Sequence, residues 1–281
     1  MKLKIIHETD YLFSTEVFLE PHVLRFKPRS SPFLDIHSFD LEVFPKPFGI
    51  REQTDAENNA THFCWFDGMH KQLSIRSELV VDSREFNPFN FIVHPSTYLI
   101  LPFIYANPLR ELLAGNLKTE NEIERLSEYG EKILSRSKNN TLTFLSNLTQ
   151  SIHYDFTVEA RLNGEPYAPE KTFHLKKGSC RDLAWMQIQL LRSLGIAARF
   201  VSGYYYLSDV NPEYELHAWT EAYIPGAGWI GLDPTHGLFT ENSHIPVCSG
   251  AHYDTTMPVT GSVRGTATSE MKTNLNIQVI G

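Results

Sequence analysis

The sequence predicts an α+β protein, in which a buried helix packs on an antiparallel sheet and a separate β domain precedes both. Three stretches carry this prediction. Residues 1–84 alternate apolar and polar side chains between turns rich in proline and glycine, as half-buried strands do. Residues 183–194 repeat apolar side chains at helical spacing, and Gly195 follows as a stop signal. Residues 197–233 then return to the strand pattern.

The alternation in the N-terminal part is clearest at residues 39–44 and 73–81. Residues 55–59 have the composition of a hairpin turn and lead into an apolar run at residues 61–66. We therefore predict a small antiparallel β-sandwich or barrel over residues 1–84. Since this part shows no catalytic spacing, we expect it to have a structural or docking role.

A linker and several helices are predicted next. Residues 85–105 are rich in asparagine, proline and aromatic side chains, which is typical of a linker packed against both halves. Helical patterns follow at three places: residues 111–117, 120–135 and 142–152. The chain ends in an alternating strand at residues 275–280. We therefore assign residues 106–281 to a second domain.

The composition is that of a globular protein, with 42% hydrophobic and 21% charged residues. The net charge of −8, without a basic stripe, argues against nucleic acid as a partner. The first residues lack the apolar core of a signal peptide, and the most apolar later run, residues 89–105, is broken by prolines. We expect a cytoplasmic protein without a membrane span. Three distant cysteines and the absence of zinc-ligand spacing predict no disulfide framework, metal or other cofactor.

Cys180 is the candidate nucleophile. It follows Gly178 and Ser179, which supply a turn and an N-cap, so it lies in the first turn of the predicted helix. Unpaired backbone N–H groups and the positive end of the helix dipole favour a thiolate at such a position. The alternative for an isolated cysteine is a small core residue.

His217 and Asp233 complete a candidate triad. The turn at residues 225–228 joins their strands as a hairpin, so the two side chains lie on neighbouring antiparallel strands. Because both numbers are odd, a directly opposite pairing requires an odd-length loop or a bulge. A thiol, an imidazole and a carboxylate supply the nucleophile, base and orienting group that acyl transfer requires. Taken singly, His217 could be structural and Asp233 a turn residue before proline.

Three motifs in this order resemble the transglutaminase-like superfamily. Its cysteine motif is similar to residues 178–182 (Gly-Ser-Cys-Arg-Asp), and its histidine motif to residues 217–223 (His-Ala-Trp-Thr-Glu-Ala-Tyr). Its aspartate motif is similar to residues 228–235 (Gly-Trp-Ile-Gly-Leu-Asp-Pro-Thr). The N-terminal β region and residues 244–265 further resemble the bacterial two-domain branch, whose members are described as candidate cysteine proteases.

The resemblance implies a papain-like core and catalytic roles for Cys180, His217 and Asp233. It also implies a second oxyanion donor upstream of the cysteine, for which Tyr154 is our candidate beside the backbone N–H of Cys180.

Each of three further positions has two possible roles. The first is His236, which stands where we expect asparagine in this branch, and which is either a second polar group in the site or, as we favour, a surface residue. Asp182 either binds a substrate amine or, as we favour, complements the helix dipole. Tyr204, with Tyr205 and Tyr206, either lines a substrate groove or belongs to the core.

The expected function is cysteine-dependent acyl transfer or hydrolysis at an amide or peptide bond of a peptide or protein substrate, through a thioester on Cys180. The resemblance favours hydrolysis over protein cross-linking, because the branch is described as protease-like, whereas fold and triad are compatible with both. A non-catalytic binding scaffold is the alternative from another class. Acetyl transfer from a thioester cofactor onto an arylamine would use the same triad, but no motif indicates a nucleotide cofactor.

Overall fold

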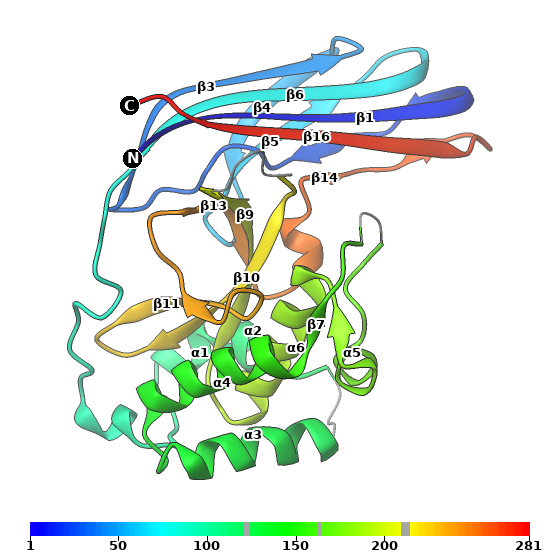
Figure 1. Ribbon diagram of the computed structural model, residues 1–281. Helices are drawn as coiled ribbons and strands as arrows, with labels where there is room; N and C mark the ends of the chain where they lie inside the picture. The colour runs from blue at the N-terminus through cyan, green and yellow to red at the C-terminus, as the bar shows by residue number, and fades with distance from the viewer. Residues whose placement is uncertain (121–123, 162–163, 209–213) are drawn as a thin grey trace.

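The computed structural model describes residues 1–120, 124–161, 164–208 and 214–281. A β-sandwich of two sheets forms the top of the molecule, most helices form the bottom, and a further sheet lies between them (Figure 1). The predicted α+β class is confirmed. In the described residues, no helix is long and apolar enough to cross a membrane.

The sandwich consists of two antiparallel sheets. The larger has the order β15-β1-β6-β3, with β16 also paired to β1, and the smaller has the order β14-β2-β5-β4. The strands of the larger sheet are β1 (Lys2–Leu19), β3 (Leu34–Phe44), β6 (Met69–Ser83), β15 (Val263–Arg264) and β16 (Ser269–Val279). Those of the smaller are β2 (His22–Leu24), β4 (Gly49–Thr54), β5 (Ala60–Trp65) and β14 (Val259–Thr260). Side chains that alternate along these strands form a core between them.

The C-terminal strands belong to the sandwich, although the sequence analysis assigned them to the second domain. β16 pairs with β1 over eleven residues, from Leu3 opposite Val279 to Phe13 opposite Ser269. β14 pairs with β2, and β15 pairs with β1. The alternating pattern identified a strand near residue 277 but not its partner, because strand pairing between the two ends of a chain leaves no local signal.

The helical layer includes six α-helices among the described residues. They are α1 (Leu109–Leu112), α2 (Ala114–Leu117), α3 (Glu124–Arg136), α4 (Thr141–Asp155), α5 (Pro169–Leu175) and α6 (Cys180–Ser193). The predicted helix at residues 120–135 corresponds to α3, and its residues 121–123 lie outside the described part of the chain. Two short 3-10 helices are η1 (Ser96–Leu99) and η2 (Tyr253–Thr256), and a two-stranded parallel pair joins β7 (Thr157–Val158) to β8 (Lys177–Gly178).

The middle sheet is antiparallel and has the order β12-β11-β10-β9-β13. Its strands are β9 (Ala198–Tyr205), β10 (His217–Ile224), β11 (Gly228–Asp233), β12 (Leu238–Phe239) and β13 (His244–Gly250). Helix α6 is buried on nearly all sides, since Leu183, Trp185 and Ile188 are at most 1% exposed. These apolar side chains pack against β9 and β10 in the core, where the polar residues Gln187 and Arg192 of α6 are also buried and hydrogen-bonded.

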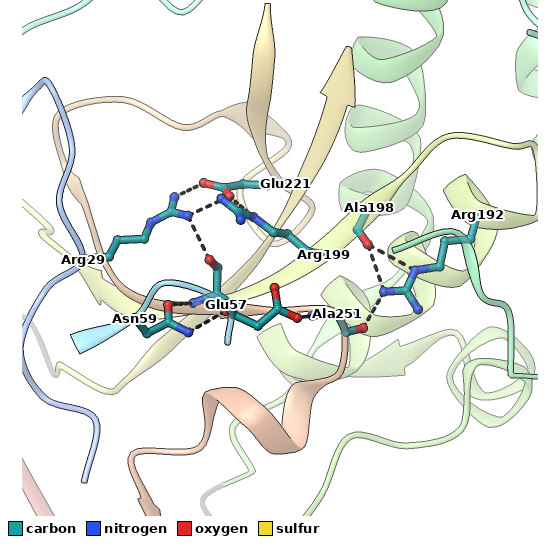
Figure 2. Close-up of polar contacts among 9 residues, drawn as sticks. Arg29, Glu57, Asn59, Arg192, Ala198, Arg199, Glu221 and Ala251 are labelled. Atoms are coloured by element: carbon teal, nitrogen blue, oxygen red, sulfur yellow. Dashed lines mark hydrogen bonds and ion pairs between the residues drawn. The ribbon is translucent and has the colours of Figure 1, made fainter. Parts of the chain in front are cut away.

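A polar network joins the sandwich to the middle sheet (Figure 2). Glu221 on β10 accepts hydrogen bonds from Arg199 of β9 (2.7 Å) and from Arg29, which follows β2. The Asn59 side chain exchanges two hydrogen bonds with the backbone of Ser249, each 2.8 Å long. The Glu221 contacts therefore fix the sandwich on β10, the strand that also carries His217, and the Asn59 contacts fix it on β13.

Candidate active site

The start of helix α6 holds Cys180 through a closed set of hydrogen bonds. Ser179 precedes the helix with extended dihedral angles, and both its backbone N–H and its hydroxyl donate to Oδ2 of Asp182, at 2.7 and 2.6 Å. Gly178 is required here, because a Cβ atom would come within 2.7 Å of Cβ of Asp182. Cys180 is therefore the partly exposed first residue of a rigid helix.

The Asp182 side chain stabilises the start of α6 and is not accessible to a substrate. Its side chain is fully buried, and its Oδ1 accepts from the Arg161 guanidinium and from the backbone N–H of Tyr167, each at 2.6 Å. Burial acts to raise the pKa of Asp182, but the hydrogen bonds from Ser179, Tyr167 and Arg161 hold it below its usual value. With both oxygens occupied, the alternative that Asp182 binds a substrate amine is wrong.

The β10–β11 hairpin brings His217 and Asp233 together. Ile224 pairs with Gly228 across a three-residue loop, and this register places Asp233 diagonally across from His217 on the same face. Nε2 of His217 lies 2.8 Å from Oδ2 of Asp233. Cys180 lies close enough to the His217 ring to raise the pKa of the imidazole, together with Asp233. Thiol, imidazole and carboxylate thus form one continuous array.

The charges of the array support an imidazolium at neutral pH. Burial acts to lower the pKa of His217, but the charge of Asp233, its hydrogen bond and Cys180 raise that pKa to about 10. Burial acts to raise the pKa of Asp233, yet His217 and further hydrogen bonds hold it well below its usual value. A protonated His217 beside an ionised Asp233 is therefore the stable arrangement.

Two histidines that the sequence analysis left out of the site also reach Asp233. Nδ1 of His236 lies 2.8 Å and Nε2 of His244 lies 3.0 Å from Oδ2 of the carboxylate. The favoured surface reading of His236 is therefore wrong, since its side chain is about one-third exposed and bonded to Asp233. The Tyr205 ring packs against all three imidazoles, with centroid distances of 4.4 to 5.5 Å.

Three of these side chains also have the spacing of a cation site. The ligand atoms of His217, Asp233 and His236 all lie within 4.8 Å of one another. However, both ring nitrogens point at one carboxylate oxygen at hydrogen-bond distance, and the raised pKa of His217 favours the form without a free lone pair. The geometry fits a hydrogen-bonded cluster better than a set of metal ligands.

The two tyrosines predicted for the site have different positions. Tyr204 is 1% exposed, packs among core residues under the sandwich and lies 3.2 Å from Nδ1 of His7 through its hydroxyl, so it lines no substrate groove. Successive strand residues point to opposite faces, and Tyr205 is the one on the face of His217. Tyr154 is 80% exposed at the end of α4, and its role as oxyanion donor stays a prediction.

The other two cysteines are buried in the core. Cys64 is fully buried and Cys248 is 1% exposed. Burial raises the pKa of Cys64 to about 11 and that of Cys248 to about 12, so both hold their protons at neutral pH. Among the three thiols, Cys180 alone combines partial exposure with an imidazole partner.

Comparisons of sequence confirm the predicted resemblance. Residues 3–82 match the family of bacterial transglutaminase-like N-terminal regions, and residues 128–234 match the transglutaminase-like superfamily. An uncharacterized protein of Mycobacterium tuberculosis is 25% identical over 280 residues, which cover 93% of this chain and 87% of that protein. A protein-glutamine gamma-glutamyltransferase of Pseudomonas aeruginosa is 29% identical over 96 residues, which cover 31% of this chain but 14% of that protein.

A solved structure shows the same fold over the whole chain. It is described as "a Putative Cysteine Protease from Cytophaga hutchinsonii", and it superposes with a TM-score of 0.72 at 20% sequence identity. The alignment covers 100% of this chain and 92% of that one. The sandwich and the core below it are therefore one recurring two-part architecture.

Proposed function

The chain carries a bacterial transglutaminase-like N-terminal region and a transglutaminase-like core, and from this premise we propose that it is a cysteine-dependent amide hydrolase or acyl transferase. The observation that carries the proposal is the array of Cys180, His217 and Asp233, with the thiol at the start of a buried helix and the imidazole between thiol and carboxylate. The substrate class that fits such chemistry is a peptide or protein amide.

In the proposed reaction, the Cys180 thiolate attacks the amide carbonyl carbon and forms a tetrahedral oxyanion. The backbone N–H of Cys180, at the start of α6, stabilises this charge. The C–N bond then breaks as the His217 imidazolium gives its proton to the leaving amine or ammonia, and a thioester remains. A water molecule gives a proton to His217 and attacks the thioester, which releases the acid and restores the thiolate–imidazolium pair.

Thiol reactivity tests the assignment without a known substrate. Limited iodoacetamide treatment at neutral pH, read by peptide mass spectrometry, is expected to modify Cys180 well before Cys64 and Cys248. His217→Ala should slow the modification of Cys180, because the imidazole that stabilises the thiolate is lost. Faster modification of either buried cysteine would contradict the proposal, and an unreactive Cys180 would favour the binding scaffold.

The pH dependence tests the partner of His217. The rate constant kcat/KM for an amide substrate is expected to fall at alkaline pH with a midpoint near 10, because His217 then no longer holds the proton for the leaving amine. Asp233→Asn removes the charge that raises this pKa, so the alkaline midpoint should move to lower pH and kcat should fall by about two to four orders of magnitude. An unchanged midpoint in the variant would show that Asp233 does not act on His217.

Hydrolysis and cross-linking differ in what accepts the acyl group. With a glutamine-containing peptide, hydrolysis releases ammonia without consuming an added primary amine, whereas cross-linking incorporates that amine. We propose hydrolysis, because the resemblance favours it. If each ammonia released were matched by one incorporated amine, the reaction would be acyl transfer and not hydrolysis.

A further inference from the structure

His244 is a buried histidine to which the proposed reaction gives no role. It lies at the start of β13, opposite Tyr205 of β9, and its side chain is 2% exposed. Its ring packs against those of Tyr205 and Trp219, at centroid distances of 4.5 and 5.2 Å. A histidine enclosed by two aromatic rings could be only a packing residue, but its two nitrogens are both engaged in specific contacts.

The backbone fixes the tautomer of His244. The N–H of Glu241 donates to Nδ1 of the imidazole at 3.2 Å, so this nitrogen must carry the lone pair. The proton of the neutral ring then lies on Nε2, which points at Oδ2 of Asp233 from 3.0 Å. Burial also lowers the pKa of His244 and favours the neutral ring. His244 is therefore neutral, and its Nε2–H donates a hydrogen bond to Asp233.

The Asp233 carboxylate forms hydrogen bonds with groups from three structural elements. Its Oδ1 accepts from the backbone N–H groups of Thr235 and His236 in the turn after β11, at 2.9 and 3.3 Å. Its Oδ2 receives His217 from β10, His236 from the same turn and His244 from β13. Of the three imidazoles, only His244 is both fully enclosed and fixed in its tautomer by a backbone donor, so it supplies a rigid contact from outside the hairpin.

We infer that His244 is a positioning residue, whose Nε2–H holds the Asp233 carboxylate in the rotamer that receives His217. The inference rests on the proposed function, in which the carboxylate orients the imidazole of the catalytic base. Without this donor the carboxylate can rotate away from His217, which weakens the alignment of the imidazole toward Cys180. The titratable groups that face His217 are Asp233, Cys180, His236, His244 and Tyr205.

Two substitutions separate positioning from packing. His244→Phe keeps an enclosed ring of similar size but cannot donate, whereas His244→Gln places an amide that can donate to Asp233 and accept from Glu241. His37→Gln, at an exposed position of β3, is the matched control. The measurements are the melting temperature, the rate of Cys180 alkylation, the pKa of His217 by NMR, and kcat and KM for an amide substrate.

We expect His244→Phe to lower kcat about tenfold to a hundredfold with KM within twofold, in keeping with the loss of one hydrogen bond to a charged group. Cys180 alkylation should slow by a similar factor, and the pKa of His217 should fall because Asp233 is no longer held beside it. His244→Gln should restore most of each quantity. Alkylation and the His217 pKa can be measured even if no amide is hydrolysed, so failure of the proposed function would not hide the result. A His244→Phe protein that loses only melting temperature, with kcat, alkylation rate and His217 pKa unchanged, would overturn the inference.

Discussion

Cys180→Ala is expected to reduce amide turnover to the background rate while the protein stays folded. The thiol is the proposed nucleophile, and alanine is a small residue that suits the first turn of a helix. His217→Ala should be almost as damaging, because both the base for the thiol and the acid for the leaving amine disappear. By comparison with other nucleophile–base pairs, each loss should be about four to six orders of magnitude in kcat.

The double variant Cys180→Ala/His217→Ala tests whether the two residues act together or contribute independently to the rate. If Cys180 and His217 act together, removing both should cost no more than removing either one. Turnover is measured for the wild type, both single variants and the double variant, with circular dichroism to confirm folding. Cys64→Ala is the matched control, since it removes a buried thiol from the core of the sandwich and should leave kcat unchanged. Full turnover by a folded Cys180→Ala protein would place the reaction at another site.

The parts of this site that could be predicted from the sequence are those determined by residues close together in the chain. The helix that begins at Cys180 follows from apolar spacing and from the turn and capping residues before it. The hairpin that carries His217 and Asp233 follows from its strand patterns and from the turn at residues 225–228. The odd-length loop that the numbering required is the three-residue connection between Ile224 and Gly228.

The parts that could not be predicted depend on pairings between distant segments. His244 reaches Asp233 because β13 pairs with β9, and nothing near residue 244 specifies that partner. The sequence pattern could not distinguish Tyr204 from Tyr205 for a related reason: a slip of one residue exchanges the two faces of a strand, and only the register decides which tyrosine faces the histidines. His236 had a local signal, its position three residues after Asp233, which places it within reach of that carboxylate in a tight turn.

Glu221 is expected to be the most costly single charge to remove from the junction between sandwich and core. Its side chain is 8% exposed and lies between Arg29 and Arg199, whose own side chains are 16% and 13% exposed. Glu221→Ala leaves two largely buried guanidinium groups without their shared carboxylate. Breaking a buried ion pair in this way typically costs about 3–5 kcal/mol of the free energy of unfolding. Chemical denaturation measures this value, and Glu128→Ala, which removes an exposed pair with Lys132, should cost at most about 1 kcal/mol.

The same carboxylate should make stability depend on acid. Burial acts to raise the pKa of Glu221, but Arg29 and Arg199 lower it from 4.5 to about 2 in the folded protein. A lowered pKa means that the charge network stabilises the protein fully above the pKa of the unfolded chain, and that this contribution is lost as the pH falls from about 4.5 toward 2. Glu221→Gln has no proton to take up, so its free energy of unfolding should fall less steeply than that of the wild type over this interval. Equal slopes for the two proteins would show that Glu221 does not carry its charge at the junction. Glu221 and His217 lie on one face of β10, four residues apart, so a steeper loss in the wild type would show that acid weakens the contact between the sandwich and the strand that carries His217.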